Sequence, residues 1–171
     1  MIHSSEPFGT LSASAQAQLD AVGAVWATDI NKHRDLVVKT YSPLVQETDN
    51  SGIEVLRDLQ YGEDERHRLD VYTRSEFIKT EEPPRDVLMF FHGGAFIRGN
   101  KSANGAIYDN VSYWFAHQGC VAVNVEYRLA PQAPYPGGAE DVIAAVRWVQ
   151  QNITLFGGNV QRIFLMGHSA G

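Results

Sequence analysis

The sequence contains the stretch Ile163-Phe164-Leu165-Met166-Gly167-His168-Ser169-Ala170-Gly171, in which an apolar run leads into a serine flanked by glycines. The apolar run predicts a strand that is buried on both faces of a parallel sheet. The last five residues match the G-x-S-x-G pattern, in which a serine occupies a sharp turn after a strand and its small neighbours leave the hydroxyl exposed. Ser169 is therefore the candidate nucleophile, and a Gly-Ser surface loop is the alternative.

Two further apolar runs precede this stretch, at residues 87–91 and 121–125, and each predicts another buried strand. Helical periodicity separates the runs. Residues 102–117 predict a helix with an inward face of Ile107, Val111, Trp114 and Phe115, and residues 139–153 predict one with Val142, Val146, Val149 and Ile153. This alternation predicts an α/β fold with a mostly parallel sheet, flanking helices and reactive groups at the carboxyl ends of the strands.

The first fifty residues have a helical pattern. Ser12 or Ser14 is suited to cap a helix whose apolar face holds Leu19, Val22, Trp26 and Ile30. A second helix is expected to end near Tyr41, because the residue before a proline avoids the helical conformation and Ser42-Pro43 follows.

An antiparallel hairpin is predicted between the helical segment and the alternating region, with strands at residues 53–61 and 68–72 and a polar turn between them. The sequence therefore predicts two parts. Residues 1–50 form a helical segment that is a candidate cap over a site, and residues 51–171 form part of an α/β domain.

The sequence His92-Gly93-Gly94-Ala95 follows the first apolar run of the alternating region. Ester hydrolysis needs hydrogen-bond donors aimed at the oxygen on which negative charge develops. Glycines let the backbone approach that oxygen closely, and a second donor comes from the residue after the nucleophile. The candidate oxyanion-hole donors are therefore the backbone N–H groups of Gly93, Gly94 and Ala170. A simple tight turn is the alternative for the two glycines.

The chain resembles the hormone-sensitive-lipase-like branch of α/β-hydrolase-fold carboxylesterases. Five motifs carry the resemblance, which covers about residues 53–171: Phe90-Phe91-His92-Gly93-Gly94-Ala95-Phe96, Tyr127-Arg128-Leu129-Ala130-Pro131, Tyr135-Pro136 with Glu140-Asp141, Phe156-Gly157-Gly158-Asn159, and Gly167-His168-Ser169-Ala170-Gly171. The resemblance implies a Ser-Asp/Glu-His triad that hydrolyses carboxylic esters, often with short acyl chains. The family's loop is usually His-Gly-Gly-Gly, and Ala95 departs from it.

In this fold the triad acid and histidine follow the serine along the chain, and Ser169 is followed by two residues only. We therefore expect an incomplete chain that lacks both groups, has no esterase turnover by itself, leaves its third strand with an open edge and needs a missing C-terminal half as partner. Two alternatives stay open. One is an amide hydrolase, because the hairpin also resembles that of kynurenine-formamidase-like enzymes, and the other is a non-catalytic half-fold that binds.

Other polar residues receive structural interpretations. We expect His92 to organise its loop, Arg128 to pair with a carboxylate, and Asp141 to favour the start of a helix through the helix dipole. His168 is adjacent to Ser169, but adjacency in a tight turn does not direct its ring at the serine hydroxyl.

Composition excludes several classes of function. The chain has 171 residues, is 44% hydrophobic and 20% charged, and carries a formal net charge of -6, which argues against binding to nucleic acid phosphates. We identify no metal-ligand cluster, phosphate-binding loop or cofactor motif. The single cysteine, Cys120, excludes an internal disulfide, and we expect it to pack as a small apolar side chain. With no signal peptide and no membrane span identified, the expected location is the cytoplasm.

Overall fold

The computed structural model describes residues 12–78 and 83–171, and residues 1–11 of the predicted helical segment lie outside the described residues. The chain divides into two compact units, with the boundary between Asp49 and Asn50. The first unit is helical, as predicted, and contains α1 (Ala13–Val25), the short 3-10 helix η1 (Trp26–Thr28) and α2 (Ile30–Gln46). No helix among the described residues is both long enough and apolar enough to cross a bilayer.

The break between α1 and α2 corrects the predicted apolar face of the first helix. The hydroxyl of Ser12 caps α1 by accepting a hydrogen bond from the N–H of Ala15 at 3.1 Å. Asp29 then caps a new helix by accepting from the N–H of Lys32. Trp26 and Ile30 therefore lie outside α1, because a side-chain cap at Asp29 restarts the helix one turn later.

The predicted end of the second helix near Tyr41 was wrong, since α2 contains Pro43 and continues to Gln46. The residues after the proline keep helical hydrogen bonds, as the N–H of Glu47 donates to the carbonyl of Pro43 at 3.0 Å. The hydroxyl of Ser42 donates to the carbonyl of Val38 one turn back. A proline removes one donor from a helix, and here a single turn beyond it is retained.

The second unit is a five-stranded mixed sheet in the order β1-β2-β4-β3-β5. Its elements are β1 (Ile53–Gln60), β2 (Arg68–Arg74), β3 (Arg85–Phe91), α3 (Asp109–His117), β4 (Val121–Val125), α4 (Gly137–Asn152), the 3-10 helix η2 (Ile153–Phe156) and β5 (Gly158–Gly167). The predicted hairpin is confirmed, because β1 pairs antiparallel with β2. The β4, β3 and β5 strands are parallel, as predicted for the alternating region.

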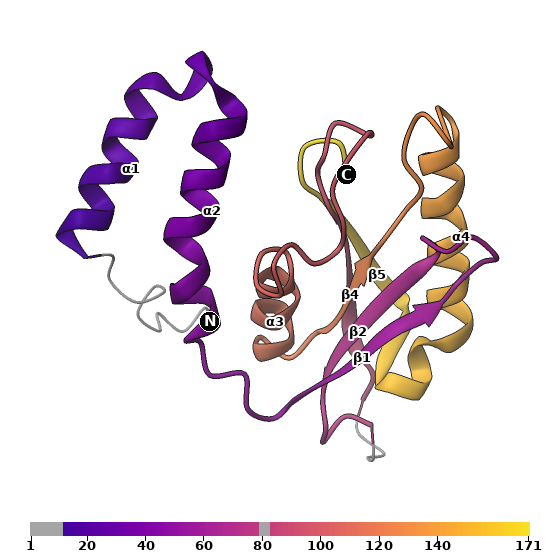
Figure 1. Ribbon diagram of the computed structural model, residues 1–171. Helices are drawn as coiled ribbons and strands as arrows, with labels where there is room; N and C mark the ends of the chain where they lie inside the picture. Colours follow the sequence, from indigo (N-terminus) through magenta and orange to yellow (C-terminus); the bar gives the residue numbers. More distant parts are fainter. Residues whose placement is uncertain (1–11, 79–82) are drawn as a thin grey trace. The chain divides into compact units, whose positions relative to one another are not determined.

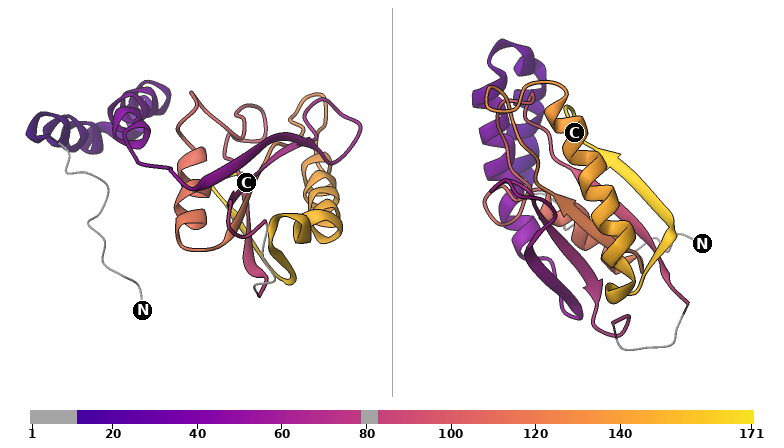
Figure 2. Two further views of the ribbon diagram at one scale, coloured as in Figure 1. Left: turned by 90° about the horizontal axis from the view of Figure 1, so that it is seen from below. Right: turned by 90° about the vertical axis from the view of Figure 1, so that its right-hand side faces the viewer.

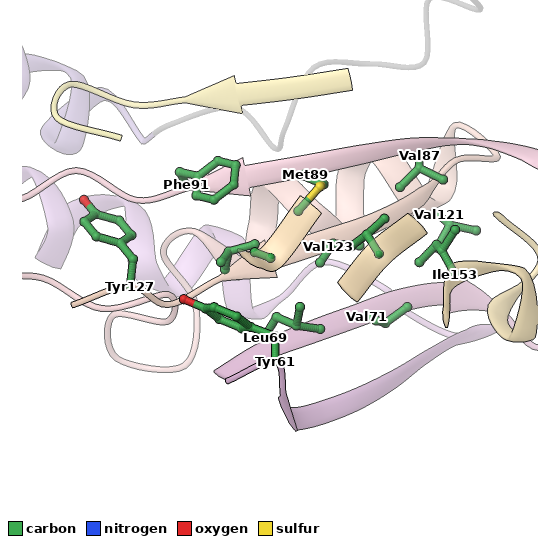
Figure 3. Packing of buried hydrophobic residues seen from close by; sticks show 13 residues of the cluster. Tyr61, Leu69, Val71, Val87, Met89, Phe91, Val121, Val123, Tyr127 and Ile153 are labelled. Carbon is green, nitrogen blue, oxygen red and sulfur yellow. The ribbon is translucent and has the colours of Figure 1, made fainter. Parts of the chain in front are cut away.

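The two long helices of this unit cover opposite faces of the sheet, with α3 on one side and α4 on the other (Figures 1 and 2). The larger core lies on the α4 face and joins alternate residues of β2, β3 and β4 to Ala145 and Val149 of α4. Figure 3 shows side chains of this cluster lying side by side on neighbouring strands. Each fully buried aliphatic side chain of such a core contributes about 1.5–3 kcal/mol, so this face supplies most of the stability of the unit.

The helix predicted for residues 102–117 starts later than expected, at Asp109. The backbone of Tyr108 is left-handed, with φ 75°, and a residue in that conformation interrupts a right-handed helix. The inward face also differs from the prediction, because Ser112 and Ala116 are buried whereas Trp114 is 42% exposed. The carboxylate of Asp109, on the same face, is buried against the sheet, where it contacts Arg57 and Tyr72.

The third strand was predicted to be buried, and the structure corrects this. Phe164, Leu165 and Met166 of β5 are 52%, 56% and 41% exposed. Within the described chain β5 pairs only with β3 and occupies an edge of the sheet, so neither of its faces is covered at its carboxyl end. The apolar run predicted burial wrongly, whereas the expected open edge of this strand is what the described residues show.

Candidate active site

The turn that holds Ser169 directly follows β5. The N–H of His168 continues the parallel ladder by donating to the carbonyl of Phe91 at 3.1 Å, and the N–H of Gly171 donates back to the carbonyl of His168 at 3.0 Å. Ser169 lies between these two bonds with φ 56°, an unfavourable left-handed conformation for a residue with a side chain. Its side chain is exposed, as the sharp turn predicts.

The loop after β3 lies against this turn, since the carboxyl ends of neighbouring parallel strands meet (Figure 1). Gly93 is buried there, and a Cβ built on it would lie 3.2 Å from the Cβ of Ser169 and 2.7 Å from Nδ1 of His168. Any side chain at position 93 would therefore displace the turn, so this close approach requires glycine.

Gly94 needs glycine for a different reason. Its φ of 151° is rarely adopted by residues with a side chain, and a Cβ at this position would overlap the carbonyl oxygen of Arg98. The carbonyl of Gly94 in turn accepts hydrogen bonds from the N–H groups of Ile97 and Arg98. Ala95, the departure from the family's third glycine, has φ 55°, so the position retains a glycine-like conformation without the glycine.

Three backbone donors of the site are unused within the described chain. The N–H groups of Gly93, Gly94 and Ala170 donate no hydrogen bond to another described residue. Buried or partly buried N–H groups are normally paired, so unpaired donors beside an exposed serine can serve a ligand. The predicted oxyanion donors and the predicted nucleophile thus come together in one place.

A buried polar network supports residues 93–95, which are called the glycine loop below. His92 is fully buried, and its Nε2 lies 2.9 Å from Oε1 of Glu126 while its Nδ1 lies 2.9 Å from the carbonyl oxygen of Gly93. Arg66 also pairs with Glu126. The ring of Tyr127 stacks on His92 at 4.4 Å, and its hydroxyl donates to the carbonyl of His92 at 2.6 Å. His92 therefore organises the loop, as expected. One of its ring nitrogens faces Glu126, and the other faces the carbonyl oxygen of Gly93.

Burial and the neighbouring charge of Glu126 raise the pKa of Tyr127 to about 12, which keeps its hydroxyl protonated as a donor. Sequence reasoning missed Glu126 and Arg66 as parts of this support. Their signal was the position of Glu126 immediately after a buried strand, where polar residues collect around a site.

An ion pair between Arg128 and Asp141 joins two of the sequence motifs. Arg128 donates to Asp141 through its backbone N–H at 2.8 Å, its Nε at 2.9 Å and its Nη2 at 2.7 Å. Nε2 of His67 lies 3.0 Å from the same carboxylate. Arg128 pairs with a carboxylate as expected, but Asp141 turns inward to it instead of acting mainly on the helix dipole. Burial would raise the pKa of Asp141, and the hydrogen bonds from Arg128 and His67 outweigh burial and lower it.

No histidine or carboxylate among the described residues hydrogen-bonds to the hydroxyl of Ser169. The ring of His168 turns away to Tyr108, whose hydroxyl lies 3.1 Å from Nδ1. No group of three or more potential metal ligands occurs in residues 12–78 and 83–171.

The fold is that of the α/β hydrolases. Residues 88–171, just under half of the chain, match the family described as alpha/beta hydrolase fold. The resemblance to its carboxylesterases is also confirmed. Esterase LipC of Mycobacterium tuberculosis is 35% identical over 115 residues, which are 67% of this chain and 27% of that protein. Carboxylesterase 1D of Mus musculus is 35% identical over 122 residues, 66% of this chain and 20% of that protein.

Solved structures agree on the fold. Esterase B from Lactobacillus rhamnosis matches 94% of this chain and 47% of its own with a TM-score of 0.65 at 23% identity. A bacterial heroin esterase matches 96% of this chain and 50% of its own with a TM-score of 0.65 at 26% identity. The chain therefore spans about half the length of these solved esterases and a smaller part of the curated relatives.

Proposed function

We propose that this protein hydrolyses carboxylic esters through an acyl-enzyme on Ser169. The observation that carries the proposal is the meeting of an exposed serine in a left-handed turn with the unused N–H groups of Gly93, Gly94 and Ala170. A surface loop or a binding module needs neither the strained serine nor the donors. The esterase relatives support the same class of substrate.

In the proposed reaction, Oγ of Ser169 attacks the ester carbonyl carbon while a base takes its proton. The carbonyl oxygen becomes an oxyanion and accepts hydrogen bonds from the three backbone N–H groups, which are already fixed and need no rearrangement. The alcohol leaves with the proton returned by the base, and an acyl-serine remains. Water then attacks the acyl group by the same route and regenerates the serine.

The base is proposed to be a histidine, oriented by a carboxylate, and both lie outside the described residues. This follows from the absence of any such partner of Ser169 in the described chain and from the order of the triad in this fold. Without a base the hydroxyl stays protonated and is a poor nucleophile. We therefore expect no measurable turnover from a 171-residue protein with this sequence when it is purified alone.

The first test is labelling of the protein in its natural source with a serine-reactive fluorophosphonate, followed by mass measurement of the intact adduct and of the labelled peptide. We expect the label on Ser169 of a species larger than 19.0 kDa, the mass of this chain. A label on Ser169 of a 19.0 kDa species would contradict the expected inactivity and would mean that a partner supplies the base. A protein labelled equally well after Ser169→Ala would overturn the proposed nucleophile.

Ester hydrolysis is separated from amide hydrolysis by substrate. With the labelled protein in hand, kcat/KM is measured for a short-chain p-nitrophenyl ester and for an arylformamide under the same conditions. We expect the ester to be preferred, and a preference for the arylformamide would assign the amide class instead. Binding of both substrates without turnover of either would identify a non-catalytic protein.

A further inference from the structure

Tyr108 is held in an unfavourable conformation next to the proposed active site. It precedes α3 with φ 75° and ψ −38°, in the left-handed region that aromatic residues rarely adopt. Such strain persists only where the surroundings determine it, and it concentrates at functional sites. The conformation of Tyr108 is therefore expected to depend on its contacts with other elements.

One side of Tyr108 contacts the turn of residues 167–171 that holds Ser169, which is called the elbow below. Its hydroxyl lies 3.1 Å from Nδ1 of His168, and the two ring centroids are 5.8 Å apart. Its ring also lies beside Phe90 at the end of β3 and beside His92 below the glycine loop, at centroid distances of 5.6 Å and 6.2 Å. The tyrosine thus contacts both the strand that leads to the loop and the residue that precedes Ser169.

The other side of Tyr108 is anchored through the next residue. Asp109 is 1% exposed, and its carboxylate accepts hydrogen bonds from Arg57 of β1 and from the hydroxyl of Tyr72 of β2, the latter at 2.6 Å. Arg57 is bound in turn to the buried Asp70 at 2.8 Å. These contacts hold the start of α3, directly after Tyr108, against the sheet.

The ring of His168 needs such a support. Its Nδ1 would lie 2.7 Å from a Cβ at Gly93, so the ring fills the space directly beside the glycine loop. His168 is otherwise exposed, and in residues 12–78 and 83–171 the bond to Tyr108 is the hydrogen bond that orients its ring. The ring therefore lies between Tyr108 and the loop that contains Gly93.

We propose that Tyr108 is a positioning residue, which orients the ring of His168 and thereby fixes the elbow of Ser169 against the glycine loop. This role rests on the proposed function. It acts through His168 and not on the substrate, so its effect belongs to the alignment of the nucleophile with the oxyanion donors. A misalignment of about 1 Å is enough to cost up to about 100-fold in rate.

The test is a double-mutant cycle in the whole protein, with the variants Tyr108→Phe, His168→Leu and both together. The readouts are kcat and KM for a short-chain p-nitrophenyl ester, the rate constant of fluorophosphonate labelling at Ser169, and the melting temperature. We expect Tyr108→Phe to lower kcat and the labelling rate about tenfold while KM and melting temperature stay unchanged. In the His168→Leu background the same change should lower them less than about twofold.

The matched control is Tyr135→Phe, which removes a hydroxyl from a side chain that is 93% exposed and is expected to leave every readout unchanged. The positioning role would be overturned if the factor by which kcat falls in the double variant equalled the product of the factors in the two single variants. An unchanged kcat for Tyr108→Phe would overturn it as well. So would a fall in melting temperature that accounts for the lost activity.

A second measurement separates this proposal from the proposed function. The ¹⁵N chemical shift of Nδ1 of His168 reports its hydrogen bond directly, and we expect it to change in Tyr108→Phe but not in Tyr135→Phe. A protein whose Ser169 is never labelled would overturn the proposed function together with this role, even with the chemical-shift change present. A protein that is labelled but shows no such change would retain the function and lose the positioning role.

Discussion

Single residues of the glycine loop differ in what their backbones permit. Gly94 has φ 151° and no room for a Cβ beside the carbonyl of Arg98, whereas Ala95 has φ 55° and already carries a Cβ. Both positions lie in the sequence Gly-Gly-Ala, and the pattern of letters does not distinguish them. We therefore expect an alanine at position 94 and a glycine at position 95 to differ in their effects on stability.

Gly94→Ala is expected to destabilise the protein by about 2 kcal/mol or more and to abolish most of the activity, because the loop must move to clear the Arg98 carbonyl. Ala95→Gly is expected to change stability by less than about 1 kcal/mol, since relief of a left-handed alanine is offset by the greater freedom of glycine in the unfolded chain. Urea unfolding and ester turnover measure both. Equal effects of the two variants would contradict the backbone geometry.

Elements are held together by ion pairs between buried carboxylates and partly exposed arginines, which sequence periodicity does not show. The start of α4 is bound to the segment after β4 through Arg128 and Asp141, and the start of α3 is bound to the hairpin through Arg57 and Asp109. Both carboxylates sit in the first or second turn of a helix, where a position on a helical wheel suggests a solvated charge. Their burial follows from which strands lie next to each helix.

Arg128→Gln is expected to destabilise the protein by about 3 kcal/mol, because it leaves the buried carboxylate of Asp141 with His67 as its remaining side-chain partner. Adding Asp141→Asn should recover part of this loss, since the uncompensated charge is then removed. Urea unfolding gives the free energies of the cycle. The matched control is Arg147→Gln. Arg147 is an exposed residue of α4, the helix that contains Asp141, and its substitution should change stability by less than about 0.5 kcal/mol.

The same pair predicts an acid dependence. The pKa of Asp141 is lowered below its ordinary value of 3.8 in the folded state, against the effect of burial, by hydrogen bonds from Arg128 and His67. Its contribution to stability is therefore complete above about pH 4 and is lost as the pH falls through the lower folded pKa. We expect parent and Asp141→Asn proteins to converge in stability below that range. A difference that stays constant down to pH 2 would argue against this assignment.

At the scale of the whole molecule, the sheet of the described chain has two edge strands, β1 and β5, and β5 exposes large apolar side chains. The register with β3 puts Leu165 beside Met89 on the α4 face and Phe164 beside Leu88 on the opposite face, so both faces of β5 expose large apolar side chains. An unpaired strand with exposed apolar residues is a template for association with another strand.

Self-association of the 171-residue protein is therefore expected to depend on β5. Leu165→Lys should lower it by placing a charge on the open edge, as measured by analytical ultracentrifugation across a range of concentrations. Ile143→Lys is the control, because Ile143 has a similar exposure of 52% but lies on α4, away from the sheet edge. An equal effect of the two variants would mean that exposed apolar area alone, and not the strand edge, drives association.

Local sequence patterns predict the class of fold, the five strands and the candidate site residues Ser169, Gly93, Gly94 and Ala170. Apolar runs of strand length, glycines at fixed places and a serine after a strand are properties of neighbouring residues. Their roles in catalysis remain predictions, whereas the α/β-hydrolase fold is confirmed.

Three features could be seen in the structure alone: where α3 begins, which of its faces is buried, and that Tyr108 reaches His168 sixty residues away. Each of these depends on which elements become neighbours. The helical pattern of residues 102–108 ends in a positive φ at Tyr108, next to the contact of Asp109 with Arg57, and exposure of a strand depends on what packs beside it. Pairings between distant residues are set by the sheet order, which no local pattern encodes.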